Sequence, residues 1–186
     1  NGASVSTSGA QSYNDVVTLG ANVTITGANV TFSDTVNGAQ TLTVNDSGTT
    51  TFTSAVGATT GLTSLTTDAA GTTVINGGSV STSGAQTYND VVTLGANTTI
   101  TGASVTFGNT VDGAQTLTVN DGGTTTFGSA VGGTTGLTSL TTDAAGTTAL
   151  NGASVSTSGA QTYNDAVTLG ANTTITGASV TFGNTV

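Results

Sequence analysis

The sequence predicts an all-β protein with the architecture of a parallel β-solenoid, in which short strands coil around one axis and each coil stacks on the one before it. Three observations lead to this prediction. The chain repeats itself every 75 residues, its Thr and Val residues occur in short runs separated by Gly and Asn, and its aromatic residues recur at a spacing of 18–20 residues. Fixed spacing of this kind is typical of stacked units that share one core.

The 75-residue repeat organises the whole chain. The segment NGASVSTSGAQSYNDVVTLG at Asn1 returns as NGGSVSTSGAQTYNDVVTLG at Asn76 and as NGASVSTSGAQTYNDAVTLG at Asn151. We therefore divide the chain into repeat unit 1 at residues 1–75, repeat unit 2 at residues 76–150 and a partial unit 3 at residues 151–186. Because stacked units bury their apolar faces only against their neighbours, we expect one continuous solenoid across all three.

Shorter coils are predicted inside each repeat. Apolar residues can be arranged in columns with steps of 18–20 residues, so that four coils fill each repeat and about 10 coils fill the chain. One column contains every aromatic residue. It runs through Tyr13, Phe32, Phe52, Tyr88, Phe107, Phe127, Tyr163 and Phe182, and Ala70 and Ala145 take its fourth place in the first two repeats. The sequence therefore predicts one internal ladder of stacked side chains, with coils about 4.8 Å apart.

Gly and Asn mark the bends between the predicted strands. The pairs Asn1-Gly2 and Asn37-Gly38 and the segment Gly20-Ala21-Asn22 separate runs of β-forming residues, and both residue types tolerate the left-handed backbone of sharp corners. The same Asn-Gly pairs also suit tight hairpins, which makes a string of antiparallel immunoglobulin-like domains the rival fold. That fold gives no reason for aromatic residues to share one phase, and the solenoid is preferred.

Composition excludes most chemistry. The chain has no Lys, Arg, His, Cys, Met, Trp or Pro, and its nine charged residues are all Asp, for a net charge of −9. Nucleic acid and anionic lipid are therefore not expected as partners, because both are bound through Lys and Arg. Without His or Cys, there is no imidazole base, thiolate or ligand for zinc, iron or copper. No apolar stretch approaches the roughly 20 residues that span a bilayer, so no membrane insertion is expected.

Asp15 and Asp34 are the only candidates for a site. They share a phase in adjacent predicted coils, and two neighbouring carboxylates are able to bind Ca²⁺ or to resemble the acid and nucleophile of a glycosidase. In the later repeats the second carboxylate is replaced by Asn109 and Asn184. Solvated bend residues are the plainer interpretation, so we expect no catalytic residue and no cofactor, with Ca²⁺ as the weak alternative.

An outward column of Ser and Thr raises a different hypothesis. It begins Ser6, Thr24, Thr43, Thr63, Ser81 and Thr99. Flat arrays of paired Thr match the lattice of ice, but the partner column two residues earlier reads Ser4, Asn22, Thr41 and Gly61, which is not a regular second row. Cross-strand Thr pairs that stabilise a sheet are the plainer account of this column.

The repeat texture resembles a known family. The segments GAQTYNDVVTLGANTTITGASVTF and GGTTTFGSAVGGTTGLTSLTTDAAGTTALNG are similar to the repeats of large secreted bacterial exoproteins of the filamentous haemagglutinin and autotransporter-adhesin type. The resemblance implies a right-handed parallel β-helix in a surface fibre or stalk.

These observations lead to three functional hypotheses. The first is a structural segment of an extracellular bacterial surface fibre or adhesin stalk, secreted to the cell surface and not an enzyme. The second is an adhesive module that binds glycans or surfaces through its Thr and Asn faces. The third, hypothesised from Asp15 and Asp34 alone, is a polysaccharide-acting β-helix enzyme. The expected partners are further copies of the repeat, in the same chain or stacked end to end as a homopolymer, because a solenoid needs its terminal coils covered.

Overall fold

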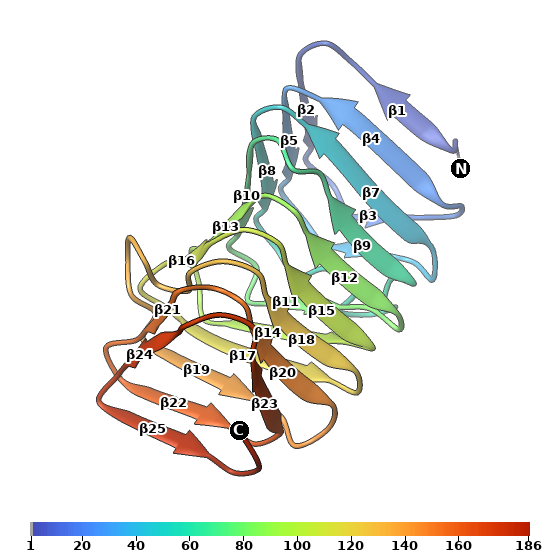
Figure 1. The fold of residues 1–186 in the computed structure, drawn as a ribbon. Helices are drawn as coiled ribbons and strands as arrows, with labels where there is room; N and C mark the ends of the chain where they lie inside the picture. Colours follow the sequence, from blue (N-terminus) through green and yellow to red (C-terminus); the bar gives the residue numbers. More distant parts are fainter. Residues whose placement is uncertain (1) are drawn as a thin grey trace.

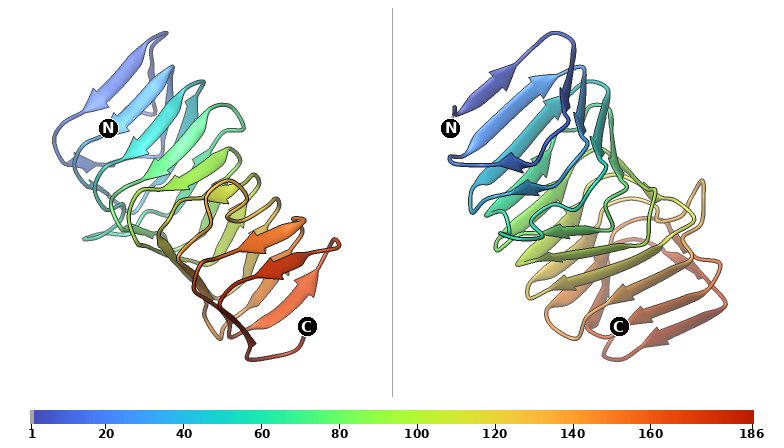
Figure 2. Two further views of the ribbon diagram at one scale, coloured as in Figure 1. Left: turned by 90° about the vertical axis from the view of Figure 1, so that its left-hand side faces the viewer. Right: turned by 180° about the vertical axis from the view of Figure 1, so that it is seen from behind.

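The computed structural model describes residues 2–186, which form a parallel β-solenoid of nine turns with three sides. All strand pairs are parallel, and the two termini lie at opposite ends of the stack (Figure 1). Views from two other directions show the same stack of turns from end to end (Figure 2). The described residues include no helix of the length and hydropathy needed to cross a membrane.

Each turn contributes one strand to each side of the solenoid. The first side is a nine-stranded sheet of β1 (Ser4–Ser6), β4 (Val23–Gly27), β7 (Thr41–Asp46), β9 (Ser64–Thr67), β12 (Ala85–Tyr88), β15 (Ser104–Phe107), β18 (Thr124–Phe127), β20 (Thr147–Leu150) and β23 (Ala166–Leu169). The second side holds β2 (Ala10–Tyr13), β5 (Asn29–Phe32), β8 (Thr49–Phe52), β10 (Thr72–Ile75), β13 (Val91–Leu94), β16 (Val111–Asp112), the bridge residue Val131, β21 (Ser154–Ser156) and β24 (Thr174–Thr176). The third side holds β3 (Val17–Thr18), β6 (Val36–Asn37), the bridge residue Val56, β11 (Ser79–Ser81), β14 (Thr98–Gly102), β17 (Thr116–Asp121), β19 (Ser139–Thr142), β22 (Ala160–Tyr163) and β25 (Ser179–Phe182).

Alternation along each strand separates the core from the surface. In β7, for example, Leu42 and Val44 are buried and Thr41 and Thr43 are half-buried on the outside. Side chains of successive strand residues point to opposite faces, so the inner faces of the three sides meet and enclose one continuous apolar core. The sequence provides this pattern because Val, Leu, Ile and the aromatic residues alternate with Thr and Ser, which also favour extended backbone.

The 75-residue repeat does not contain four whole turns. From Ser4 to the residue before Ser79, the chain contains ten strands and the bridge residue Val56, which makes eleven strand positions on three sides. A repeat therefore advances by three turns and two thirds, and the chain has nine turns rather than ten. As a consequence, equivalent strands of successive repeats lie on different sides: β1 on the first, β11 on the third and β21 on the second.

Unequal turn lengths explain this difference from the sequence-based estimate. On the first side Ile25 pairs with Val44, 19 residues later, but Val44 pairs with Thr67, 23 residues later. The extra residues form a loop that starts at Gly57, where φ is +73° and a Cβ atom would collide with the carbonyl oxygen of Ser81. Only glycine adopts this backbone at no steric cost. The even 18–20 residue spacing therefore fails once in every repeat.

The axial ends of the stack expose residues of the core type. Side chains that are fully buried in the middle turns are partly exposed in the first and last turns, where Val5 is 41% and Phe182 is 38% exposed. By contrast, Phe107 in the centre is 0% exposed. Each turn thus depends on the turns above and below it for its burial.

Candidate functional site

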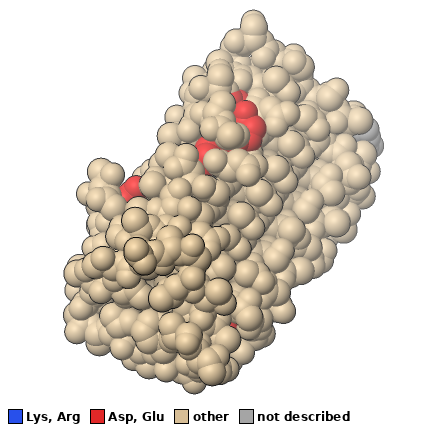
Figure 3. Space-filling view, viewed as in Figure 1, with Lys and Arg blue, Asp and Glu red and all other residues tan. Residues whose placement is uncertain are grey.

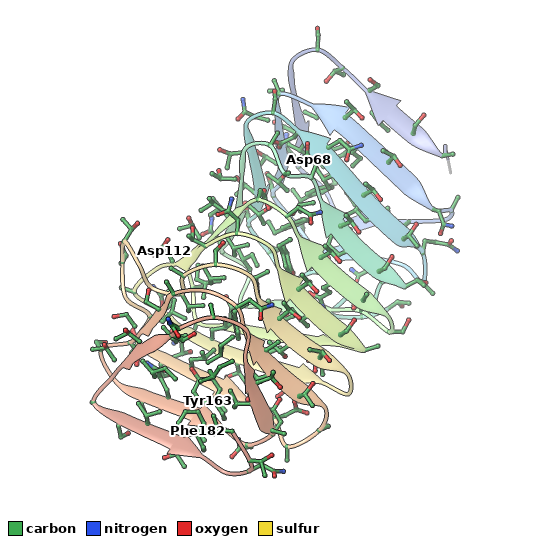
Figure 4. All side chains as sticks on the ribbon, in the orientation of Figure 1. Asp68, Asp112, Tyr163 and Phe182 are labelled. Atoms are coloured by element: carbon green, nitrogen blue, oxygen red, sulfur yellow. The ribbon has the colours of Figure 1, made fainter. Side chains whose placement is uncertain are left out.

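The interior contains three separate stacks of aromatic rings rather than one continuous ladder. Tyr13, Phe32 and Phe52 stack on the second side with ring centroids 5.0 and 5.3 Å apart. The second stack lies on the first side and the third lies on the third side: Tyr88, Phe107 and Phe127 are 5.3 Å apart, and so are Tyr163 and Phe182. Figure 4 shows Tyr163 and Phe182 one above the other near the C-terminal end.

The end of each full stack is capped by an aliphatic side chain. Phe52 pairs with Ile75, and Phe127 pairs with Leu150. The residues expected in these places, Ala70 and Ala145, instead lie exposed in bends. The rings are separated between repeats because eleven strand positions move the start of each repeat to another side.

A buried glutamine explains why each stack starts with tyrosine. The Tyr88 hydroxyl donates to Gln86 Oε1 at 2.8 Å, and Gln86 Nε2 donates to the carbonyl oxygen of Thr101 at 2.8 Å and to the hydroxyl of Thr82 at 3.2 Å. Gln86 is fully buried, so these bonds replace the water that its amide would lose. The same arrangement recurs around Gln11 and Gln161. Burial raises the pKa of Tyr88 and Tyr163 above that of a free tyrosine.

Two of the nine aspartates are buried beside threonines of the preceding turn. Asp90 accepts hydrogen bonds from the hydroxyls of Thr67 and Thr73, each at 2.7 Å, and Asp165 accepts from Thr142 and Thr148 at 2.8 Å. Asp90 is 2% and Asp165 is 1% exposed. Burial raises the pKa of Asp90, while the two hydroxyls lower it by a smaller amount. These clusters fasten one turn to the next through a side chain.

Two further aspartates close the corners after β7 and β17. Asp46 Oδ2 accepts from the backbone N–H of Val30 at 3.1 Å and from the hydroxyl of Thr50 at 2.9 Å. Asp121 accepts from the hydroxyl of Thr125 at 3.0 Å, and its pKa is raised by burial. Its Oδ1 is the one buried side-chain polar atom without a partner among residues 2–186. From the sequence these four buried aspartates were indistinguishable from solvated turn residues, because their Thr partners are distant in the chain.

The candidate pair Asp15 and Asp34 occupies a surface corner of the first two turns. Their registers match, because Tyr13 pairs with Phe32 and Val17 pairs with Val36. Asp15 is exposed, and Asp34 Oδ1 accepts a hydrogen bond from the backbone N–H of Thr35. Within residues 2–186 no three acidic side chains gather in a group able to hold a metal ion. Asp15 is the counterpart of Asp90, and the two Thr hydroxyls that Asp90 receives from the turn before it have no equivalent in the described part of the chain.

The outer surface of the first side carries two rows of small polar side chains. The main row follows the paired residues Ser4, Thr24, Thr43, Thr66, Thr87, Thr106, Thr126, Ala149 and Thr168. The second row, two residues earlier in each strand, contains Thr41, Ser64, Ala85, Ser104, Thr124, Thr147 and Ala166. Thr66 and Ser64, rather than Thr63 and Gly61, continue the rows after β7 because the intervening turn is longer.

Acidic groups lie at the edges of this surface. Figure 3 shows the first side without charged atoms over β4 to β15, and the red atoms lie at the corners beside it. Asp68 and Asp112 mark these corners in Figure 4. Asp112 accepts hydrogen bonds from the backbone N–H groups of Thr134 and Thr135, which fixes the base of a protruding loop.

Comparison of the chain with models of protein families, with curated proteins and with solved structures finds no match in any of the three.

Proposed function

We propose that this protein is a structural segment of an extracellular bacterial surface fibre or adhesin stalk, in which it supplies rigid length. The single observation that supports this role most directly is the uninterrupted core, which continues through all nine turns with no change of axis and no side-chain cluster suited to catalysis in residues 2–186. A core built of equivalent turns lengthens in proportion to the number of repeats.

Composition supports a role outside the cell. With no Lys or Arg the chain offers trypsin-like proteases no cleavage site, and with no Cys or Met it lacks the sulfur atoms that are oxidised most readily. The resemblance of its repeats to those of filamentous haemagglutinin-type exoproteins agrees with the same location.

Further turns of the same repeat are the proposed partners. Core-type side chains such as Val5, Leu169 and Phe182 are exposed at the axial ends, and the backbone groups of the terminal turns have no strand beyond them in the described chain. Another turn of equal shape covers both, in the same chain or in a stacked second copy.

The test is a length series of arrays with two, four and six repeats, measured by small-angle X-ray scattering. A rigid solenoid gains about 18 Å per repeat, from three turns and two thirds at about 4.8 Å each. A flexible string of units instead lengthens with roughly the square root of repeat number. Linear growth supports the proposal, and square-root growth contradicts it.

A proteolysis experiment tests durability separately. Proteinase K cleaves without needing Lys or Arg, so resistance to it depends on the folded rod. The expected result is survival of the intact segment at a protease concentration that digests a heat-unfolded sample. Rapid digestion of the folded segment would count against a compact fibre.

A further inference from the structure

We propose that the outer surface of the first side binds ice. The two rows described above place hydroxyl and methyl groups at regular intervals over nine strands. The inference goes beyond the structural role and does not depend on it.

The spacing of the rows matches a crystalline water surface. Along a row, neighbouring side chains are separated by the inter-strand distance of about 4.8 Å, and across the rows by two residues of extended strand, about 6.6 Å. Both distances are close to the spacings of oxygen atoms on the prism face of hexagonal ice. A protein surface with these two periods is able to order water molecules at lattice positions over its whole length.

The side chains that form the main row are fixed and accessible. Threonine is branched at Cβ, which restricts its χ1 angle, so successive hydroxyls are held in similar positions. Thr66, Thr87 and Thr106 are half-buried, and in the described chain their hydroxyls make no hydrogen bond to protein atoms. In the second row Thr124 and Thr147 share one hydroxyl contact of 3.0 Å. The main row is therefore free to bind water.

Other occupants lack the groups that would recognise them. Protein interfaces are rich in Tyr, Trp and Arg, and glycan sites commonly stack sugar rings on aromatic side chains. Neither row contains an aromatic or charged residue. The hollows of the surface lie in the first and last turns, around Asp15 and around Gly170, and not over the rows. A flat, uncharged and periodic surface suits a flat, uncharged and periodic ligand.

The third side carries the same pattern over six strands. Its main row is Ser79, Thr99, Thr118, Thr141, Thr162 and Thr181. On the second side the rows are interrupted by Val74, Val91 and Asp112, so that side provides a control within the same molecule.

The test compares two double variants with the unmodified chain. T87Y with T141Y places a bulky ring in the middle of the main rows on the first and third sides. T31Y with T93Y makes the same change at half-buried positions of the second side. Adsorption to growing ice and shaping of ice crystals are measured, and circular dichroism reports whether each variant is folded. If T87Y with T141Y does not fold, T66Y with T162Y takes its place in the same two rows.

The expected result is that the unmodified chain adsorbs to ice and shapes the crystals, that the row variant loses both effects, and that the second-side variant keeps them. The proposal is overturned if the folded unmodified chain does not adsorb to ice, or if both variants lose adsorption equally. Crystalline cellulose is included as a second periodic surface, and adsorption to cellulose in place of ice would also overturn it.

Discussion

Removal of one ring from the middle of a stack tests whether the interior stacks hold the turns together. Phe107 is fully buried between Tyr88 and Phe127, with both centroid distances 5.3 Å. Phe107→Ala deletes the ring and leaves a cavity that neighbouring turns cannot close without breaking their backbone pairing. Core Phe→Ala substitutions cost about 3–5 kcal/mol, and loss of two stacked neighbours places this one at the upper end.

Phe182→Ala is the matched control, because Phe182 has one stacked neighbour and is 38% exposed. Solvent fills the space that its ring leaves, so we expect a cost of about 1–2 kcal/mol. The difference of about 2 kcal/mol or more corresponds to roughly thirtyfold in the local opening constant. Native-state hydrogen exchange measures that constant turn by turn, together with the denaturant midpoint. Equal costs for the two substitutions would refute the reasoning.

Three other predictions follow from the buried groups and the corners. Tyr88→Phe leaves a buried glutamine oxygen without its donor and is expected to cost about 1–3 kcal/mol in denaturant unfolding, whereas Tyr13→Phe at the less buried counterpart costs less. Because burial raises the pKa of Asp90 in the folded state, its contribution to stability is largest below the pKa of an unfolded aspartate, about 3.9, and is lost as pH rises through the raised value; thermal unfolding from pH 3 to 7 shows this, and Asp90→Asn reduces the slope. Gly57→Ala forces a positive φ and a steric collision and is expected to lower the melting temperature, whereas Gly122→Ala, with open space around its Cβ position, leaves it nearly unchanged.

Each of these predictions has a contrary outcome. Equal costs for the two tyrosine substitutions would show that the buried glutamine does not depend on its phenol partner. A stability that increases steadily from acid to neutral pH would show that the buried carboxylates are better stabilised as anions than burial implies. A tolerated alanine at Gly57 would show that the long loop adopts another backbone path.

The sequence predicted the fold from local features, and it failed where the answer depended on turn length. Alternation of Thr with Val or Leu, and Gly at the bends, predicted parallel stacked strands, and the structure confirms them. The pairing of Phe52 with Ile75 was missed because the loop after Gly57 adds residues that no composition signal marks. The even period predicted from Tyr13, Phe32 and Phe52 holds only within those turns.

The polar interior was the other feature that the sequence did not reveal. Asp90 is buried because Thr67 and Thr73 reach it from the turn before, and residues so far apart in the chain become neighbours only when the register is known. The same register restores the double row of hydroxyls, because it places Ser64 rather than Gly61 next to Thr41. One displaced turn therefore changed the interpretation of both the core and the surface.

The eleven strand positions of a repeat have a mechanical consequence for longer arrays. If the repeat closed in whole turns, every ring stack would fall on one wall and every long loop on another, and unequal wall thickness would bow the fibre. Rotation by one side per repeat distributes bulky and thin segments equally around the axis, and the original orientation returns after three repeats, about 53 Å along the fibre at 4.8 Å per turn. The mismatch between repeat length and turn number thus works against systematic curvature.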